Sequence, residues 1–319
     1  MVAPVGHRHS SRAGRRWRHL LVRRLKRGVM DFKDDAGIDP GSIGSPSGGG
    51  GGGRVAIGGG AGVVVLLIAV LLGVNPGDLL GQNDQSQTVP ANSTAAVSHC
   101  RSGADVKRDP NCRWAAYATS INEYWETQIE GYTKAKTTPF SRSARTGCGH
   151  ADAQTGPFYC PPDKMVYLDT NFLGTLLQQL GTQSSTAAEA YIMAHEYGHH
   201  AQDLLGTLSE AHASGNQTGP KSASVRLELQ ADCYAGTYLK WTSKNKADVI
   251  DNVTRDDLAK VVEAARAVGD DHIQRQYGGG VQPDKWTHGS SRMRIHWAQR
   301  GFDTGDPAQC DTFSTNDLG

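Results

Sequence analysis

The sequence predicts a mainly α-helical domain with a small β-sheet (α+β), preceded by one transmembrane helix. Three observations lead to this fold class. Several segments after residue 100 repeat apolar residues at helical spacing and carry helix-capping residues, one short apolar run has the composition of a strand, and one long uncharged run precedes them all. With 319 residues, the chain is long enough for one sizeable domain beside segments that do not pack.

The N-terminal part, residues 1–54, is basic and rich in glycine. The net charge of the chain is +1, yet Lys and Arg exceed Asp and Glu before residue 55 and fall below them after it. The arginines follow no apolar periodicity, so we interpret this part as a solvated cytoplasmic tail that binds no nucleic acid. The change of composition at Met30 also allows residues 1–29 to be an extension beyond the true start codon.

The uncharged run covers residues 55–74. As a helix of about 1.5 Å per residue, it spans roughly the 30 Å hydrocarbon layer of a bilayer. Because basic residues precede it, we predict a cell-membrane protein that crosses once, with the N-terminus in the cytoplasm and the domain outside; a cleaved signal peptide is the alternative. Residues 75–99 are polar and predict a stalk, which leaves residues 100–319 as the extracytoplasmic domain.

All six cysteines follow the uncharged run, which places them in the compartment where disulfides persist. No Cys-x-x-Cys spacing occurs, so a zinc ribbon is a poor interpretation. Six cysteines allow many pairings. Loop spacing favours Cys100–Cys112 and Cys148–Cys160 as local pairs, and Cys233–Cys310 remains as a long-range pair.

Helix and strand signals divide the domain. Apolar residues at helical spacing, together with capping residues such as the pattern beginning at Thr186, predict helices over 112–131, 187–205, 221–241 and a segment capped by Thr254. The short apolar run at 165–169 follows two prolines and predicts a strand. Residues 207–220 and the tail after Gly280 lack these patterns and are predicted to be irregular.

The stretch from His195 to His199 has the residue types and spacing of a hydrolytic zinc site. On a helix, residues four apart lie on the same face, so His195 and His199 can bind one ion while Glu196 lies beside it. Zinc lowers the pKa of a bound water, and a neighbouring carboxylate can take its proton and pass it to a leaving amine. We therefore predict His195 and His199 as ligands and Glu196 as the catalytic base.

A third protein ligand is needed, with the fourth position left to water. A metzincin would have glycine and histidine where this chain has Gln202 and Leu205, so that class is excluded. Glu228, on the next predicted helix, is the best candidate ligand. Asp232 lies four residues further on the same face, where it can hydrogen-bond the free nitrogen of a ligand histidine. His288 lies in an irregular segment and is a further candidate, as a donor to a substrate oxyanion.

At this point the sequence resembles the bacterial "putative neutral zinc metallopeptidase" family, a membrane-anchored group of Glu-ligand zincins. The resemblance covers roughly residues 114–314. It is carried by ordered short motifs: Thr146-Gly147-Cys148-Gly149, Gly156 to Pro161, Val166 to Asp169, Ala194 to His200, Glu228 to Gly236, Gly269-Asp270-Asp271, Thr287-His288-Gly289 and Gly305 to Cys310.

The resemblance implies a zincin-like domain that binds one zinc ion through His195, His199 and, by analogy, Glu228, with Glu196 as the catalytic residue. It also implies an edge strand before the active-site helix, which would fall at Val166, Tyr167 and Leu168 and could bind a peptide by strand addition. We therefore expect a zinc-dependent peptidase, an endopeptidase acting on extracytoplasmic proteins or peptides. The alternative is a non-catalytic, zinc-stabilised binding domain at the cell surface, which would not need Glu196.

Overall fold

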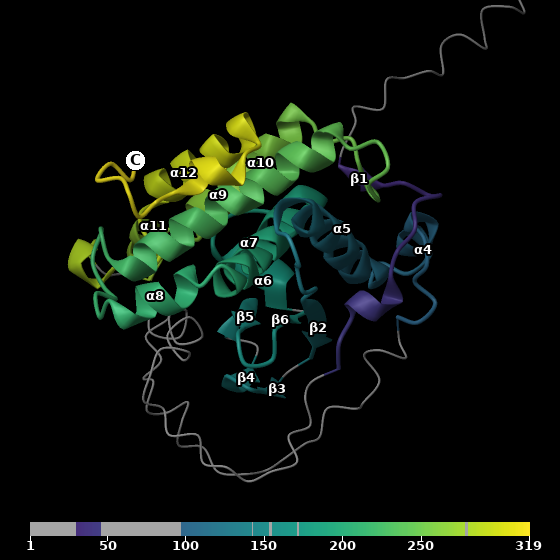
Figure 1. Cartoon of the computed structure of the whole chain (residues 1–319), viewed down its shortest axis with the longest axis horizontal. Helices are drawn as coiled ribbons and strands as arrows, with labels where there is room; N and C mark the ends of the chain where they lie inside the picture. The colour runs from purple at the N-terminus through teal and green to yellow at the C-terminus, as the bar shows by residue number, and fades with distance from the viewer. Residues whose placement is uncertain (1–29, 46–96, 142, 153–154, 171, 278–279) are drawn as a thin grey trace, which may run out of the picture.

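The computed structural model describes residues 30–45, 97–141, 143–152, 155–170, 172–277 and 280–319. Its long helices are α5 (Cys112–Gln128), α7 (Thr186–Leu204), α9 (Ala223–Lys244), α10 (Arg255–Ala267) and α12 (Ser291–Thr304). In Figure 1, α9, α10 and α12 lie together above α7 and α5, and a small sheet lies below them. The mainly α-helical, α+β class predicted from the sequence is confirmed.

The helices pack through the apolar and aromatic residues that recur at helical spacing. In α5, Trp114, Tyr117, Tyr124 and Trp125 are at most 1% exposed and belong to the main core. Burial of four large aromatic side chains in one helix stabilises the domain strongly, because each removes a large apolar area from water. The helix predicted at 112–131 is thus confirmed, with its aromatic face in the core.

The helix predicted at 187–205 is confirmed as α7, but its cap differs from the prediction. The Ser185 hydroxyl accepts a hydrogen bond from the Ala188 amide at 3.1 Å. The N-cap is therefore Ser185 and not Thr186, and the helix begins at Thr186, one residue earlier than predicted. The carboxylate of Glu189 accepts a hydrogen bond from the Arg113 guanidinium at 2.9 Å. Glu189 therefore ties α7 to α5.

The small sheet has the strand order β2 (Lys136–Phe140), β6 (Met165–Asp169), β5 (Phe158–Cys160). Strand β6 runs parallel to β2 and antiparallel to β5. A separate hairpin consists of β3 (Ser143–Thr146) and β4 (Gly149–Asp152). The strand predicted at 165–169 is confirmed with the same bounds.

The predicted position of that strand at the edge of the sheet is wrong. Val166, Tyr167 and Leu168 belong to the central strand β6 and are completely buried, so they offer no free edge. The edge strand on the α7 side is β5. With three residues, β5 is too short to show the alternation from which strands are recognised in a sequence.

Two segments predicted to be irregular contain helices. Helix α8 (Thr207–Ala213) follows Gly206, which has a φ of 82° and ends α7. Helix α12 lies in the predicted irregular tail; its buried face joins two large apolar side chains, Met293 and Trp297, to Arg294 and the small residues Ala298 and Gly301. The other helices of the described residues are α4 (Gly103–Arg108), α6 (Phe172–Gln179) and α11 (Asp270–Gln276), with the short 3₁₀ turns η1 (Pro40–Ser42), η3 (Pro283–Lys285) and η4 (Pro307–Cys310).

Residues 30–45 pack against the domain, although the sequence assigns them to a separate tail. Strand β1 (Asp31–Phe32) pairs with β7 (Ile250–Asp251), and the Gly44 amide donates to the Thr137 carbonyl at 2.8 Å. The side chains of Met30, Phe32, Ile38 and Ile43 belong to the main core. The predicted domain boundary at residue 100 is therefore wrong for residues 30–45.

The predicted membrane span at residues 55–74 and most of the predicted stalk at residues 75–99 lie outside the described residues. Within the described residues, no helix is both long and apolar enough to cross a bilayer. The three disulfides join Cys100 to Cys112, Cys148 to Cys160 and Cys233 to Cys310. The first two are the local pairs predicted from loop spacing, and the third joins the two cysteines that remained. No cysteine is left free.

Candidate metal centre and active site

The inner face of α7 brings His195 and His199 together with Glu228 of α9. The Glu228 carboxylate lies 3.1 Å from His195 Nε2 and 3.3 Å from His199 Nε2. One ligand atom from each of the three side chains lies within 4.8 Å of the others, and all three side chains are buried. The sequence-predicted ligands thus converge on one point between α7 and α9.

Each histidine ring is held by a hydrogen bond at its other nitrogen. His195 Nδ1 lies 2.9 Å from Asp232 Oδ1, and His199 Nδ1 lies 2.8 Å from Gln202 Oε1. Because both partners are oxygen acceptors, each ring can donate from Nδ1, which leaves Nε2 on the side of Glu228 to bind a metal ion. The contact of Asp232 was predicted from its spacing. Gln202 was missed, although its position three residues after His199 on the same helix face is a usable signal.

Asp232 is also bound by Arg294 of α12. The Arg294 guanidinium donates to both carboxylate oxygens, at 2.7 and 2.8 Å, and the Tyr191 hydroxyl donates to Oδ1. Burial alone would raise the pKa of Asp232, but Arg294 and His195 outweigh it and hold the pKa below its usual range. Asp232 therefore remains a carboxylate. Sequence reasoning missed Arg294, because its helix was predicted to be irregular.

The charges of the ligands follow from the same contacts. Burial alone would raise the pKa of Glu228, but His199, His288 and His195 hold it well below its usual range. Burial would lower the pKa of His195, but the hydrogen bonds that its ring donates to Asp232 and Glu228 raise it to about 10. The centre therefore holds an ionised carboxylate, Glu228, beside two imidazole rings, a donor set suited to a divalent cation.

The close approach of α7 and α9 depends on Gly198. A Cβ at this position would lie 3.1 Å from the Ala231 Cα and 3.3 Å from the Ala231 Cβ. Both distances are below ordinary van der Waals contact, so only glycine lets the two helix backbones approach this far. Gly198 lies between the two ligand histidines and thereby determines how near Glu228 comes to them.

Glu196 lies beside the ligand group with one oxygen unsatisfied. Its side chain is buried, and Oε2 has no hydrogen-bond partner. Burial raises the pKa of Glu196 despite the opposing effect of His195 and His199. The backbone amide of Tyr159, in edge strand β5, lies within reach of the same carboxylate. An unpartnered buried oxygen with a raised pKa is the arrangement expected of a proton acceptor waiting for a water.

His288 lines the same cavity as the ligands. Asp270 accepts hydrogen bonds from the backbone amides of Thr287, His288 and Gly289 at 2.8–2.9 Å, and its other oxygen lies 3.4 Å from His288 Nδ1. Burial would lower the pKa of His288, but Glu228 and Asp270 raise it. Asp270 therefore positions the loop before α12 and favours a protonated, donating imidazole at its tip.

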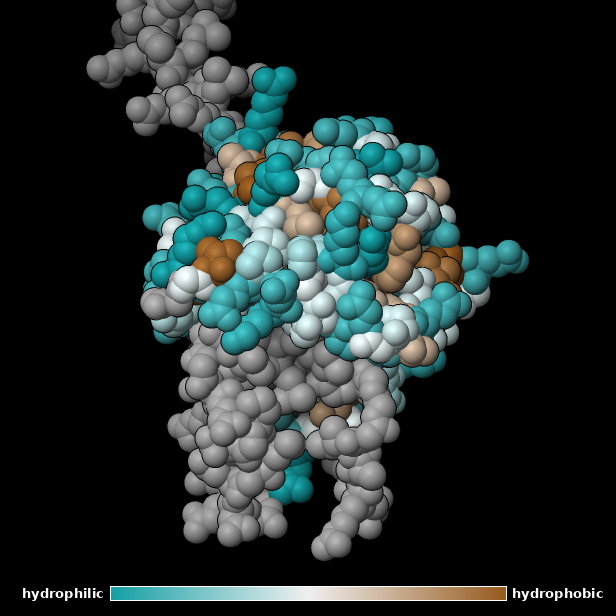
Figure 2. Space-filling view, turned by 90° about the vertical axis from the view of Figure 1, so that its left-hand side faces the viewer, coloured by the Kyte–Doolittle hydropathy of each residue, from teal (hydrophilic) through white to brown (hydrophobic). Residues whose placement is uncertain are grey.

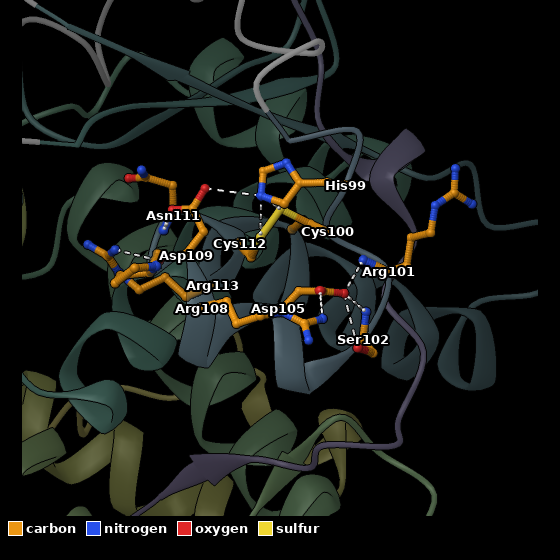
Figure 3. The surroundings of a disulfide bond; sticks show 12 residues. His99, Cys100, Arg101, Ser102, Asp105, Arg108, Asp109, Asn111, Cys112 and Arg113 are labelled. Carbon is orange, nitrogen blue, oxygen red and sulfur yellow. Dashed lines mark hydrogen bonds and ion pairs between the residues drawn. A yellow bond between two sulfur atoms is a disulfide. The ribbon is translucent and has the colours of Figure 1, made fainter.

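Two other groups of possible ligands have structural roles. His200 is buried with Nδ1 2.9 Å from the Tyr159 hydroxyl and Nε2 2.7 Å from the Thr133 carbonyl, so both nitrogens are already used. Figure 3 shows His99 beside the Cys100–Cys112 disulfide and Asp109; His99 Nε2 lies 3.6 Å from Cys112 Sγ and 3.1 Å from Asp109 Oδ2. There, however, the Cys112 sulfur is bonded to Cys100 and is not a thiolate ligand.

The donor set at α7 and α9 fits zinc. Two imidazole nitrogens and one carboxylate match the ligand types of open catalytic zinc sites, which keep one position for water. Glu196 supplies the unsatisfied carboxylate that such a water would contact. The predicted cofactor is thus supported by ligand chemistry and by the second hydrogen bonds that orient both rings.

Comparison with known proteins gives the family. The family described as "Putative neutral zinc metallopeptidase" matches residues 27–313. An uncharacterized protein of Mycobacterium tuberculosis is 43% identical over 256 residues, which cover 79% of this chain and 87% of the relative. Uncharacterized protein YpfJ of Escherichia coli is 40% identical over 216 residues, covering 64% and 73%. No solved structure matches the chain. The chain belongs to the putative neutral zinc metallopeptidase family.

Proposed function

We propose that the protein is a zinc-dependent endopeptidase in which Glu196 is the catalytic base. The observation that carries this proposal is the buried, unpartnered oxygen of Glu196 beside the three convergent ligands. A site that only stabilised the fold would be closed by a fourth protein ligand and would gain nothing from a buried carboxylate without a partner. Membership of the family supports the same reaction class.

His195, His199 and Glu228 would hold the zinc ion, which when bound polarises a carbonyl and makes a water acidic. Glu196 takes the proton of that water on Oε2 and passes it to the leaving amine. His288 donates a hydrogen bond to the carbonyl oxygen as it gains negative charge. The edge strand β5, next to Glu196, can bind the substrate backbone by strand addition.

We further propose that the domain acts outside the cytoplasm on proteins or peptides. Three disulfides and no free cysteine support an oxidising compartment. Attachment to a membrane through residues 55–74 stays a prediction. An endopeptidase is favoured because a β-strand edge binds a peptide along its length and needs no free terminus.

Replacement of the base separates catalysis from metal binding. In Glu196→Gln, we expect the zinc content to stay at the wild-type level, because the three ligands and their hydrogen bonds are unchanged. Hydrolysis of a broad peptide library should fall by roughly 100- to 10,000-fold. Zinc retained with hydrolysis lost supports catalysis. A wild-type protein that holds zinc and cleaves no peptide in the library would instead identify the non-catalytic, zinc-stabilised binding domain.

A further inference from the structure

An apolar cavity opens beside the metal ligands. Its lining includes the ligand residues and Glu196. The lining also includes an aliphatic wall of side chains from α6, α7, α11 and the residues that directly follow α6 and α10: Leu173, Leu176, Leu180, Ile192, Val268 and Ile273. A single cavity therefore joins the reacting groups to an aliphatic surface.

Much of the aliphatic wall lies apart from the main core. Leu176, Leu180 and Ile273 form a small cluster of their own with Ala267, and Val268 packs against it. The three side chains are between 3 and 8% exposed. Their burial therefore depends on short elements, α6 and α11, that meet over the cavity.

Few large apolar side chains are exposed among the described residues. Figure 2 shows that the face on the left-hand side of Figure 1 is mostly polar. Among the described residues, the exposed large apolar side chains are Leu205, Tyr277, Val281 and Phe313. In the cavity, by contrast, six aliphatic side chains lie together, where a substrate with an apolar side chain could contact them.

We propose that this cavity binds an aliphatic side chain of the substrate, on a residue next to the scissile bond. The inference rests on the proposed peptidase function. Because Glu196 and the ligands line the same cavity, a side chain in the cavity belongs to a residue adjoining the reacting carbonyl. A charged side chain among these aliphatic residues is disfavoured, since none of them carries an opposite charge or a polar partner.

The size of the cavity favours aliphatic over aromatic side chains. Its volume is about 90 Å³. An apolar cavity of roughly 150 Å³ holds one benzene molecule. The cavity is thus suited to a side chain of the size of leucine, isoleucine or valine, and a phenylalanine ring would require the α6 wall to move.

The cleavage preference of the full-length, zinc-loaded protein tests the proposal. Cleavage sites in a peptide library, located by mass spectrometry, should be enriched in Leu, Ile or Val at one position flanking the scissile bond. Matched peptides should show a kcat/KM roughly 10- to 100-fold higher with leucine than with glycine or aspartate at that position. Equal cleavage with aspartate or glycine would overturn the inference.

Enlarging the cavity should change the preference rather than only the activity. In Leu176→Ala, the ratio of kcat/KM for phenylalanine over leucine should rise roughly tenfold, because a cavity of larger volume accepts the ring. Leu208→Ala is the matched control: Leu208 is equally buried in another small cluster, outside the cavity. An equal change of the ratio in both variants would contradict the proposal.

Binding to zinc-loaded Glu196→Gln separates this inference from the proposed function. The probes are a blocked glycine peptide carrying a single leucine and the same peptide with aspartate, measured by calorimetry. If zinc-loaded Glu196→Gln binds the leucine peptide more tightly than the aspartate peptide, but the wild type hydrolyses neither, the role of the cavity is kept and the peptidase function is rejected. Hydrolysis without a leucine preference keeps the peptidase and rejects the cavity's role. If the leucine peptide binds no more tightly than the aspartate peptide and the wild type hydrolyses neither, both the role of the cavity and the peptidase function are rejected.

Discussion

Three side chains converge on Asp232: the ring of His195, the guanidinium of Arg294 and the hydroxyl of Tyr191. A carboxylate that is completely buried is tolerated only when its charge is paired and its oxygens accept hydrogen bonds. Arg294 meets both requirements, so Asp232 keeps its charge and directs the His195 ring towards the metal position. The geometry of the ligand therefore depends on a helix, α12, that contributes no ligand itself.

His199 depends in the same way on Gln202, whose amide also donates to the Leu227 carbonyl at 2.8 Å. We expect Gln202→Met to weaken zinc binding by roughly 10- to 100-fold, because the ring loses the acceptor that fixes its tautomer and orientation. The Kd for zinc, measured by competition with a chelator, checks this. The control Gln178→Met changes an exposed glutamine of α6 and should leave the Kd unchanged. An unchanged Kd in Gln202→Met would show that His199 needs no such support.

Among the elements, α7 and α9 together create the centre, and their separation is set at Gly198. We expect Gly198→Ala to lower the free energy of unfolding by about 1–3 kcal/mol, because the added methyl group overlaps Ala231 and forces the helices apart. Zinc affinity should fall as well, since Glu228 moves with α9. Chemical denaturation and chelator competition measure the two effects.

Gly174→Ala is the matched control, because Gly174 lies inside α6 and an added Cβ there meets no atom within 4 Å. That variant should be neutral or more stable by about 0.5–1 kcal/mol, as expected for alanine in an open helix position. If the two variants had the same stability, close packing at Gly198 would not be what positions α9.

The sequence predicts those elements whose signal is local. The ligands on α7, the ligand and positioning residue on α9, and the bounds of the central strand all follow from spacing within one segment. Helix α12 is not predicted, because much of its buried face consists of small and polar residues such as Arg294, whose partner Asp232 lies 62 residues away. Edge strand β5 is not predicted either, because its three residues form a strand only through pairing with β6.

At the scale of the whole molecule, distant parts of the chain meet in one domain. The disulfide between Cys233 and Cys310 joins α9 to the C-terminal segment across 77 residues, which restricts the unfolded chain more than a short loop would. The N-terminal segment joins the same domain from the other end. The Met30 amide donates to Asp257 at 2.9 Å, and the Lys33 amide to the Val249 carbonyl at 2.9 Å.

These N-terminal contacts constrain membrane topology. A chain that crossed a bilayer once at residues 55–74 would leave residues 30–45 and the domain on opposite sides, where they could not pair. We therefore expect both to lie on the same side. Asp35→Cys, in the N-terminal segment, and Ser209→Cys, on α8, each place an exposed thiol for an impermeant maleimide applied to intact bacterial cells that express the full chain.

Equal labelling of the two variants, or equal protection that is lost on lysis, agrees with the pairing of β1 and β7. Labelling of Ser209→Cys alone would show that residues 30–45 remain in the cytoplasm, and would reinstate the single crossing predicted from the sequence. The unmodified chain is the control, because all of its cysteines are paired and none should react. Phe32→Asp adds a stability test: a charge buried in the main core should lower the melting temperature only if the N-terminal segment packs there.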